Sequence, residues 1–190
     1  MKLYFSTGYD QQVLKNIQGL NSKYIGALGL LNILERELGL YKIFKDEKDR
    51  ATIYKDCLIK NKEGRFYAES LASDELNVAK QLLTYRDELI LMGWDPSNEH
   101  QPTRLKDLGA VETSFIKANG YEGVADRWQN VIINLTQEKI EEFNSLLISV
   151  MDDNSNLPNY LYLVFDKLSS IVSYEPTVLL LHYFLNYGFH

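Results

Sequence analysis

The amino-acid sequence predicts a helix-rich α/β fold with a small, mainly parallel β-sheet. Short apolar runs that suit strands lie near both ends of the chain, longer segments with helical periodicity lie between them, and the last third has the order strand, helix, strand. The chain has 190 residues, of which 45% are hydrophobic and 24% charged, as in one globular domain. We therefore expect a single domain over residues 1–190, P-loop NTPase/helicase-like or Rossmann-like, with a helical insertion at about residues 70–136.

The first elements are marked by apolar runs and by the glycines that end them. Residues 3–5 (Leu-Tyr-Phe) are a strand candidate that closes at Gly8. Leucines at helical spacing then predict a helix over residues 27–38, which ends at Gly39.

Residues 50–60 fit two interpretations. They suit a strand that turns at residues 62–64 into a hairpin with residues 65–67, and they equally suit a helix. Both alternatives stay open at this point.

Residues 74–92 give the best defined helix of the chain. Ser73 is the expected N-cap, since its hydroxyl can accept an unpaired amide hydrogen of the first turn. Gly93 ends the helix, and Trp94 is expected to fold back towards Leu89 in a Schellman-type contact. The apolar face consists of Leu76, Ala79, Leu82, Leu83, Leu89 and Ile90, and Lys80, Tyr85, Asp87 and Glu88 are interpreted as a solvated charged face.

Two more helices follow a polar loop over residues 95–102. The first begins at Thr103, and Asn119-Gly120 separates it from the second. The residues expected to point inward are Leu105, Leu108, Val111 and Phe115 in the first helix, and Val124, Trp128, Val131, Ile132 and Leu135 in the second.

The last third of the chain has the pattern of a βαβ unit. Residues 146–151 form a compact apolar run, typical of a buried strand in a parallel sheet, and Asp152-Asp153 stops it. A helix opens at Leu157-Pro158, with Leu161, Val164, Phe165 and Leu168 inside, and residues 171–174 are the next strand. We expect these strands to pair with the one at residues 3–5.

Bulk properties limit the function and the location. The formal net charge is −6 and the pI about 5.1, which argues against a broad basic surface for nucleic acid. The single cysteine, Cys57, excludes an internal disulfide and indicates a reducing compartment. We find neither a signal peptide nor an apolar run long enough to span a bilayer, so we expect a cytoplasmic protein with no membrane partner.

Nucleotide-binding motifs are absent or incomplete in the sequence. The chain contains no Walker A loop, Gly-x-x-x-x-Gly-Lys-Ser/Thr, and Ser6-Thr7-Gly8 stands where such a loop would follow the first strand. Gly26 and Gly29 suit the start of a dinucleotide fingerprint, but the third glycine is missing and no convincing strand precedes them. Helix packing is the favoured role of these two glycines.

Catalytic and metal-binding patterns are equally incomplete. Met151-Asp152-Asp153 is similar to a Walker B acid pair, so Asp152 and Asp153 are the alternative candidates for a metal site, although a polar turn is the favoured interpretation. The three histidines are scattered, and no base is marked for Cys57. We therefore predict no catalytic residue, no cofactor or cofactor-binding residue, and no metal, and we expect that this chain itself is not an enzyme.

Several motifs together resemble one family. The segments that carry this resemblance are Phe66-Tyr67-Ala68-Glu69-Ser70, Asp74, Val78-Ala79, Leu82-Leu83, Arg86-Asp87-Glu88-Leu89, Gly93-Trp94-Asp95, Arg104-Leu105-Lys106-Asp107-Leu108, Val111-Glu112, Gly123-Val124-Ala125-Asp126-Arg127-Trp128 and the later run from Asp152 to Pro176. In order and spacing they resemble the N-terminal region of bacterial AddB-like PD-(D/E)XK nuclease family proteins, which are related to helicase–nuclease subunits that process DNA ends. The motif residues Ser70, Asp74, Arg86, Asp87, Gly93 and Trp94 are expected to be structural.

The resemblance implies a function that belongs to a larger protein. In that family the N-terminal region is similar to a helicase motor domain, often without working ATP machinery, and the nuclease lies far downstream. The resemblance thus implies that the chain is an N-terminal fragment and a non-catalytic scaffold or interaction domain in DNA repair. Its partners would be a downstream nuclease domain or a helicase subunit, with DNA contacted through the assembly.

Two other functions remain as alternatives. One is a stand-alone Rossmann-like enzyme whose acidic site gathers Asp10, Asp152, Asp153 and Glu175 at the carboxyl ends of strands. The other is a protein-interaction module that uses the aromatic segment at residues 178–190.

Overall fold

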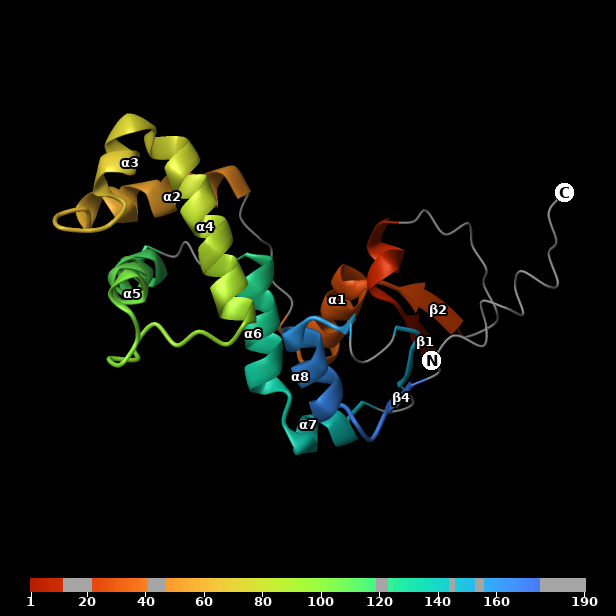
Figure 1. Ribbon diagram of the computed structural model, residues 1–190. Coiled ribbons are helices and arrows are strands. Elements are labelled where there is room, and N and C mark those ends of the chain that lie inside the picture. The colour runs from red at the N-terminus through yellow and green to blue at the C-terminus, as the bar shows by residue number, and fades with distance from the viewer. Residues whose placement is uncertain (12–21, 41–46, 119–122, 144–145, 153–155, 175–190) are drawn as a thin grey trace, which may run out of the picture. The chain divides into compact units, whose positions relative to one another are not determined.

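A computed structural model describes residues 1–11, 22–40, 47–118, 123–143, 146–152 and 156–174 of the protein (Figure 1). The prediction of a helix-rich α/β fold with a small parallel sheet is confirmed. In chain order the elements are β1 (Lys2–Phe5), the 3-10 helix η1 (Thr7–Gln11), β2 (Ser22–Ile25), α1 (Ala27–Glu37), α2 (Glu47–Lys60), α3 (Ala68–Ser73), α4 (Glu75–Leu91), α5 (Thr103–Lys117), α6 (Val124–Asn134), α7 (Gln137–Glu141), β3 (Leu147–Val150), α8 (Asn159–Lys167) and β4 (Val172–Tyr174).

The chain groups into two compact units. One, the sheet unit, combines Met1–Tyr41 with Val131–His190, and the other, the helical unit, is Lys42–Asn130. The helices α1 to α7 follow one another between β2 and β3, and they begin well before residue 70, where the helical insertion was expected to start. The prediction of a single domain that is a fragment of a longer protein stays a prediction.

The four strands of the sheet unit are all parallel and lie in the order β2-β1-β3-β4. The first strand pairs with both β2 and β3, with Leu3 opposite Ile148 and Phe5 opposite Val150. This confirms that the N-terminal strand joins the later strands in one sheet, directly through β3, and it confirms the βαβ unit formed by β3, α8 and β4. The strand order reverses beside β1, because β2 lies on one side of it and β3 on the other.

A strand that the sequence did not reveal, β2, directly precedes Gly26. The expectation that no strand stands there is therefore wrong. The reason is that β2 is a short edge strand, in which only Ile25 is buried. Its remaining residues, Ser22, Lys23 and Tyr24, therefore carry little of the apolar signal that marks a central strand.

Apolar side chains on one face of the sheet form the core of the sheet unit. Leu3 and Phe5 of β1 are completely buried, and the rings of Phe5 and Phe165 meet edge to face with their centroids 5.0 Å apart. The inward residues predicted for α8 are confirmed, since Leu161, Val164, Phe165 and Leu168 are all buried. The sequence period of three to four therefore placed this helix correctly on the sheet.

Residues 50–60 are helical, which decides between the two interpretations of this segment. The buried residues Arg50, Ala51, Tyr54, Cys57 and Leu58 follow helical spacing along α2. The proposed hairpin is wrong, because residues 61–67 form a turn that leads into α3 and contain no strand.

The C-terminal end of α4 is as predicted from the sequence, and its N-cap is a different residue from the one predicted. Gly93 has φ +83°, its N–H donates to the Ile90 carbonyl, and the Trp94 N–H donates to the Leu89 carbonyl, which is the predicted Schellman motif. The N-cap is Asp74, whose carboxylate accepts from the Asn77 N–H at 3.2 Å. Ser73 is thus not the cap, since it ends α3 and its hydroxyl donates back to the Glu69 carbonyl.

Most of the predicted inward residues of the later helices are buried. Leu108, Val111 and Phe115 of α5, and Trp128, Val131 and Leu135 in and after α6, have exposed fractions of 5% or less. Leu76 in α4 and Val124 in α6 are exposed instead, so the prediction is wrong for these two residues in the first turns of their helices. The predicted break at Asn119-Gly120 lies outside the described residues.

Candidate functional site

The carboxyl end of the sheet, where β1 and β3 stop side by side, carries a hydrogen-bonded group of three residues. The Ser6 hydroxyl donates to Asp152 Oδ1 at 2.8 Å, and the Thr7 N–H donates to Asp152 Oδ2 at 2.7 Å. The Gly8 N–H donates to the Ser6 hydroxyl at 3.3 Å. Both oxygens of the Asp152 carboxylate are thereby bound to the loop after β1, which is the place where parallel sheets of this kind bind ligands.

A second carboxylate at this end of the sheet, that of Asp10, accepts a hydrogen bond from the first turn of α1. Asp10 Oδ2 accepts from the Leu28 N–H at 2.9 Å, so it pairs with one of the amide hydrogens that the first turn leaves open. Gly26 is buried beneath it, and the two residues lie very close. The Gly26–Gly29 segment thus follows a strand and opens a helix, as a dinucleotide fingerprint would, but a carboxylate of the protein stands over it.

The four acids of the predicted acidic site do not share a described centre. Asp10 and Asp152 follow neighbouring strands, yet each is bound to a different segment. Asp153 and Glu175 lie outside the described residues. Among the residues that the structure describes, no three His, Cys, Asp or Glu side chains are placed to hold a metal ion.

Tyrosines surround the two described acids. Burial, together with Tyr24 and Asp152, raises the pKa of Tyr9, and burial together with Asp10 raises the pKa of Tyr160. Tyr24 contacts two other rings, stacking on Tyr4 at 5.0 Å and meeting Tyr9 edge to face at 5.7 Å. The phenols of Tyr9 and Tyr160 therefore stay protonated beside the carboxylates at neutral pH.

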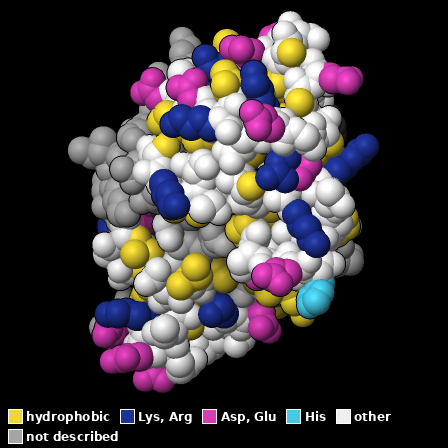
Figure 2. Space-filling view, turned by 90° about the vertical axis from the view of Figure 1, so that its left-hand side faces the viewer, with side chains coloured by type: hydrophobic (Ala, Val, Ile, Leu, Met, Phe, Trp, Pro, Cys, Tyr) yellow, Lys and Arg dark blue, Asp and Glu magenta, His cyan; other side chains and the backbone are white. Residues whose placement is uncertain are grey.

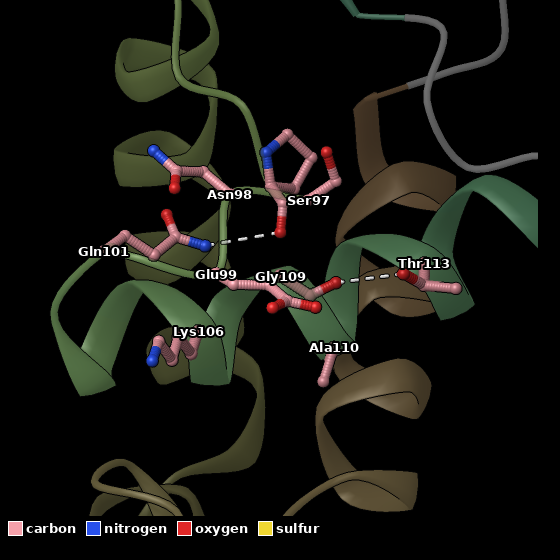
Figure 3. Close-up of a pocket in the computed structure, with 9 residues that line it drawn as sticks. Ser97, Asn98, Glu99, Gln101, Lys106, Gly109, Ala110 and Thr113 are labelled. Carbon is pink, nitrogen blue, oxygen red and sulfur yellow. Dashed lines mark hydrogen bonds between the residues drawn. The ribbon is translucent and has the colours of Figure 1, made fainter.

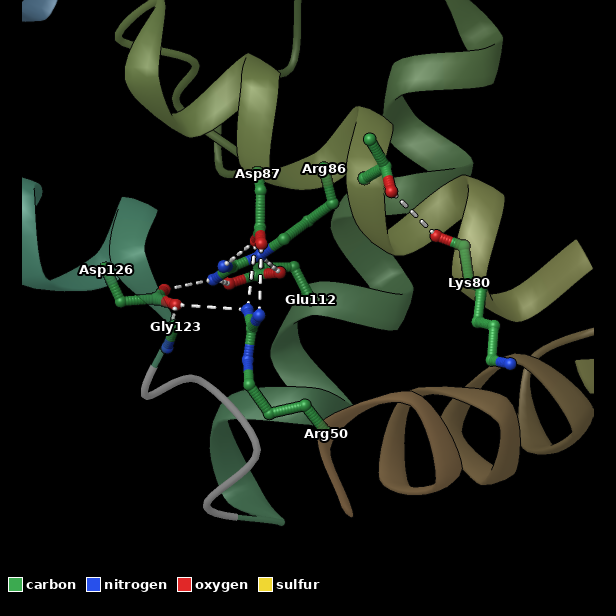
Figure 4. Close-up of polar contacts among 8 residues, drawn as sticks. Arg50, Lys80, Arg86, Asp87, Glu112, Gly123 and Asp126 are labelled. Atoms are coloured by element: carbon green, nitrogen blue, oxygen red, sulfur yellow. Dashed lines mark hydrogen bonds and ion pairs between the residues drawn. The ribbon is translucent and has the colours of Figure 1, made fainter. Parts of the chain in front are cut away.

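The helical unit contains a buried group of charged side chains that sequence reasoning missed (Figure 4). We call it the arginine cluster; its members are Arg50, Arg86, Asp87, Glu112 and Asp126. Figure 4 shows these side chains converging from α2, α4, α5 and α6. The interpretation of Asp87 as part of a solvated face is wrong, since its side chain is only 24% exposed and takes part in this cluster.

Arg86 lies at the centre of the arginine cluster and is 1% exposed. Its Nε and Nη2 donate to the two oxygens of Glu112 at 2.8 and 2.6 Å, and Nη2 also donates to Asp126 at 2.5 Å. Burial lowers the pKa of Arg86, but the hydrogen bonds to Glu112 and Asp126 outweigh it, so that the pKa is raised overall. The guanidinium also lies 5.4 Å from the centre of the Phe115 ring.

Other motif residues quoted for the family resemblance have structural surroundings. Trp94 donates its indole N–H to Gln101 at 2.7 Å and packs against the core of the helical unit. Asp74 caps α4, Gly93 ends it, and the Ser70 carbonyl accepts from the Asp74 N–H. These contacts shape the end of α3 and both ends of α4, and the structural role expected of the motif residues stays a prediction.

A pocket of about 450 Å³ lies in the helical unit between the turn after α4 and one side of α5 (Figure 3). The residues that line it are Pro96, Ser97, Asn98, Glu99, Gln101, Lys106, Gly109, Ala110 and Thr113. Gln101 is fixed at both ends, because its Nε2 donates to the Pro96 carbonyl while its Oε1 accepts from Trp94. Gly109 lets the turn approach the helix closely, because a Cβ atom there would lie 2.6 Å from the Pro96 carbonyl oxygen.

Comparisons of the chain with protein-family models, with curated proteins and with solved structures find no match. The fold defines the class of the protein, a helix-rich α/β protein with an all-parallel sheet and a helical unit. The resemblance to AddB-like proteins rests on the sequence motifs. None of the described helices has both the length and the apolar character needed to cross a membrane.

Proposed function

We propose that the chain is a non-catalytic, degenerate helicase-like N-terminal domain of an AddB-like PD-(D/E)XK nuclease protein. It acts as a scaffold or interaction domain in DNA-end processing. The observation that carries the proposal is the bonding of Asp152 to Ser6 and Thr7, at the end of β1 where a working motor would hold phosphate.

The loop after β1 makes hydrogen bonds to a side chain of the protein, Asp152, where a nucleotide-binding loop would bind phosphate. In a nucleotide-binding loop, backbone N–H groups and a lysine point at the phosphates. Here the Thr7 N–H of this loop donates to a carboxylate, and the sequence has neither the glycines nor the lysine of a Walker A loop. A carboxylate in that position also repels a phosphate, because both are negatively charged.

The family motifs support the proposal through the arginine cluster. Arg86, Asp87, Glu112 and Asp126 come from three separate motifs quoted for the resemblance, and the structure brings all four into one buried group. Arg86, Glu112 and Asp126 are buried, and a set of motif residues that bond to one another in this way suits a scaffold better than a catalytic site.

The charge distribution favours contact with DNA through the larger assembly. Figure 2 shows Lys and Arg side chains interspersed with Asp and Glu over the described part of one face, without a broad area of either sign. The net charge of −6 points the same way. A domain of this kind would owe its place on DNA to its partners.

The alternative of an acidic enzyme has less support. Its described acids, Asp10 and Asp152, each accept hydrogen bonds from a different segment, and no shared metal centre is formed by the residues that the structure describes. The third alternative depends on residues 178–190, which lie outside the described part.

Two measurements test the proposal. Purification of the native polypeptide with an antibody against residues 66–95, followed by mass spectrometry, is expected to find a nuclease module in the same polypeptide or a helicase subunit bound to it. Titration calorimetry of the 190-residue chain with Mg·ATP is expected to show no binding. A native polypeptide with neither nuclease nor helicase partner, or micromolar ATP binding with turnover, would contradict the proposal.

A further inference from the structure

The two ends of the helical unit are joined by direct contacts within the arginine cluster. This unit, Lys42–Asn130, is inserted between the two segments of the sheet unit. Arg50 lies near its beginning, in the first turn of α2, and Asp126 lies near its end, in the first turn of α6. Arg50 Nη2 and Asp126 Oδ2 are 3.4 Å apart, although 76 positions separate the two residues in the sequence.

Asp126 connects α6 to both arginines and to its own helix start. Its Oδ1 accepts from Arg86 at 2.5 Å, and its Oδ2 accepts from the Gly123 N–H at 2.9 Å as well as from Arg50. Arg50 and Arg86 are each 1% exposed and Asp126 is 6% exposed. Charge-assisted bonds of this kind are strongest where water is excluded.

The contact of Arg50 with Gly123 is equally close. A Cβ atom at position 123 would lie 2.2 Å from Arg50 Cζ and 2.4 Å from its Nη1. The guanidinium therefore lies directly against the backbone that precedes α6, and no residue other than glycine fits there without displacing it.

The apolar core of the helical unit is built without α6. Its buried members run from Ala51 to Phe115 and come from α2, α3, α4, α5 and the turn before α3, and among the described residues none comes from α6. The largest buried side chain of α6, Trp128, is not a member of this core. The described polar contacts that hold α6 to this core therefore come from the arginine cluster, through Arg50 of α2 and Arg86 of α4.

We propose that the arginine cluster is a closing device of the helical unit, which attaches α6 to α2, α4 and α5 and so joins the two ends of the unit. Breaking it releases α6 while the other four helices stay packed on their own apolar core. The inference is independent of the proposed function, since it concerns only contacts within this chain.

The test is hydrogen–deuterium exchange with mass spectrometry on the full chain carrying Asp126→Asn, with Asp107→Asn as the matched control. Asp107 is also a buried acid of the helical unit, bound to Arg65 and to the Phe66 N–H, but it lies on α5 and has no described contact with α6. Asp126→Asn is expected to speed exchange in peptides from the first two turns of α6 by about tenfold or more and to leave α4 peptides unchanged. The control is expected to leave α6 unchanged.

Gly123→Ala provides a second variant, because it disturbs Arg50 without changing any charge. It is expected to speed exchange in α6 in the same selective way. Equal acceleration in α4 and α6, in either variant, would show that the cluster is an inseparable part of the core and overturn the proposal. Unchanged exchange in α6 for both variants would overturn it as well.

Discussion

Asp10 and Gly26 lie so close together that position 26 has no room for a side chain. A Cβ atom there would stand 2.2 Å from Asp10 Cγ and 2.5 Å from the Asp10 backbone nitrogen. From this position Asp10 binds the Leu28 N–H, so the turn after β1 and the start of α1 are fixed to each other. The carboxyl end of the sheet therefore depends on a glycine that no turn geometry demands.

Gly26→Ala is expected to destabilise the protein by about 2–4 kcal/mol, because the nearest obstacle includes a backbone atom that cannot rotate away. The measurement is urea unfolding followed by circular dichroism. Gly8→Ala is the control, since a Cβ at Gly8 would meet only the Ser6 hydroxyl at an ordinary 3.7 Å. Equal unfolding midpoints for the two variants would show that the close contact between Asp10 and Gly26 does not make a side chain at position 26 destabilising.

Arg86→Met is expected to cost about 3–5 kcal/mol of unfolding free energy, because Glu112 and Asp126 would remain buried without their partner. Arg86→Lys should cost less, since it keeps the charge but loses the two-pronged bond to Glu112. Arg36→Met, at a side chain that is 63% exposed, is the control and should change stability by less than about 1 kcal/mol. Thermal and urea unfolding of the three variants measure these differences, and a loss at Arg86 as small as that at Arg36 would contradict the role of the cluster.

The strands and helices that the sequence predicted are those whose apolar residues repeat within one element. In residues 146–151 and in α8 the local sequence pattern predicts which side chains are buried, because burial follows from the position of each residue on that strand or helix. The edge strand β2 was missed because Ile25 is its only buried residue. Local periodicity thus accounts for most of the fold.

The arginine cluster was not predictable in the same way. Asp87 stands beside exposed residues on α4, and its partner Arg50 is 37 positions away. Only the packing of α2 against α4 brings the two together, so the sequence pattern of a charged helix face looks the same whether the charge is solvated or paired. The one sequence signal was that Arg86 and Asp87 lie in a segment that resembles AddB-like proteins and has no evident catalytic role.

Alkaline pH is expected to destabilise the protein through Tyr67. Burial raises the pKa of Tyr67 to about 12, with Asp107 raising it further and Arg65 lowering it. The unfolded chain releases this proton near pH 10 while the folded chain keeps it, so the unfolded state binds fewer protons in between and the unfolding free energy falls as pH rises. This contribution is fully present below about pH 10 and is lost as the pH rises towards about 12.

Tyr67→Phe removes the phenol and is expected to flatten this part of the pH dependence. The variant also loses the bond from the Tyr67 hydroxyl to the Asn61 carbonyl, so its stability at neutral pH should fall by about 1 kcal/mol. Urea midpoints of both proteins over the alkaline range measure the slope. An unchanged slope in the variant would assign the alkaline loss to other groups.

Asp152→Ala is expected to loosen the carboxyl end of the sheet, because Ser6 and the Thr7 N–H lose an acceptor that comes from a different strand. The matched control is Asp95→Ala, since Asp95 also accepts from one backbone N–H and one serine hydroxyl, but both belong to Ser97 in the same turn. We expect a cost of about 1–3 kcal/mol for Asp152→Ala and less for Asp95→Ala, together with faster amide exchange at Thr7 in the first variant only. Comparable losses in both variants would mean that Asp152 does no more than shape its own turn. Mg·ATP should not bind to Asp152→Ala, because removing the acid does not supply the lysine and glycines that a phosphate loop requires.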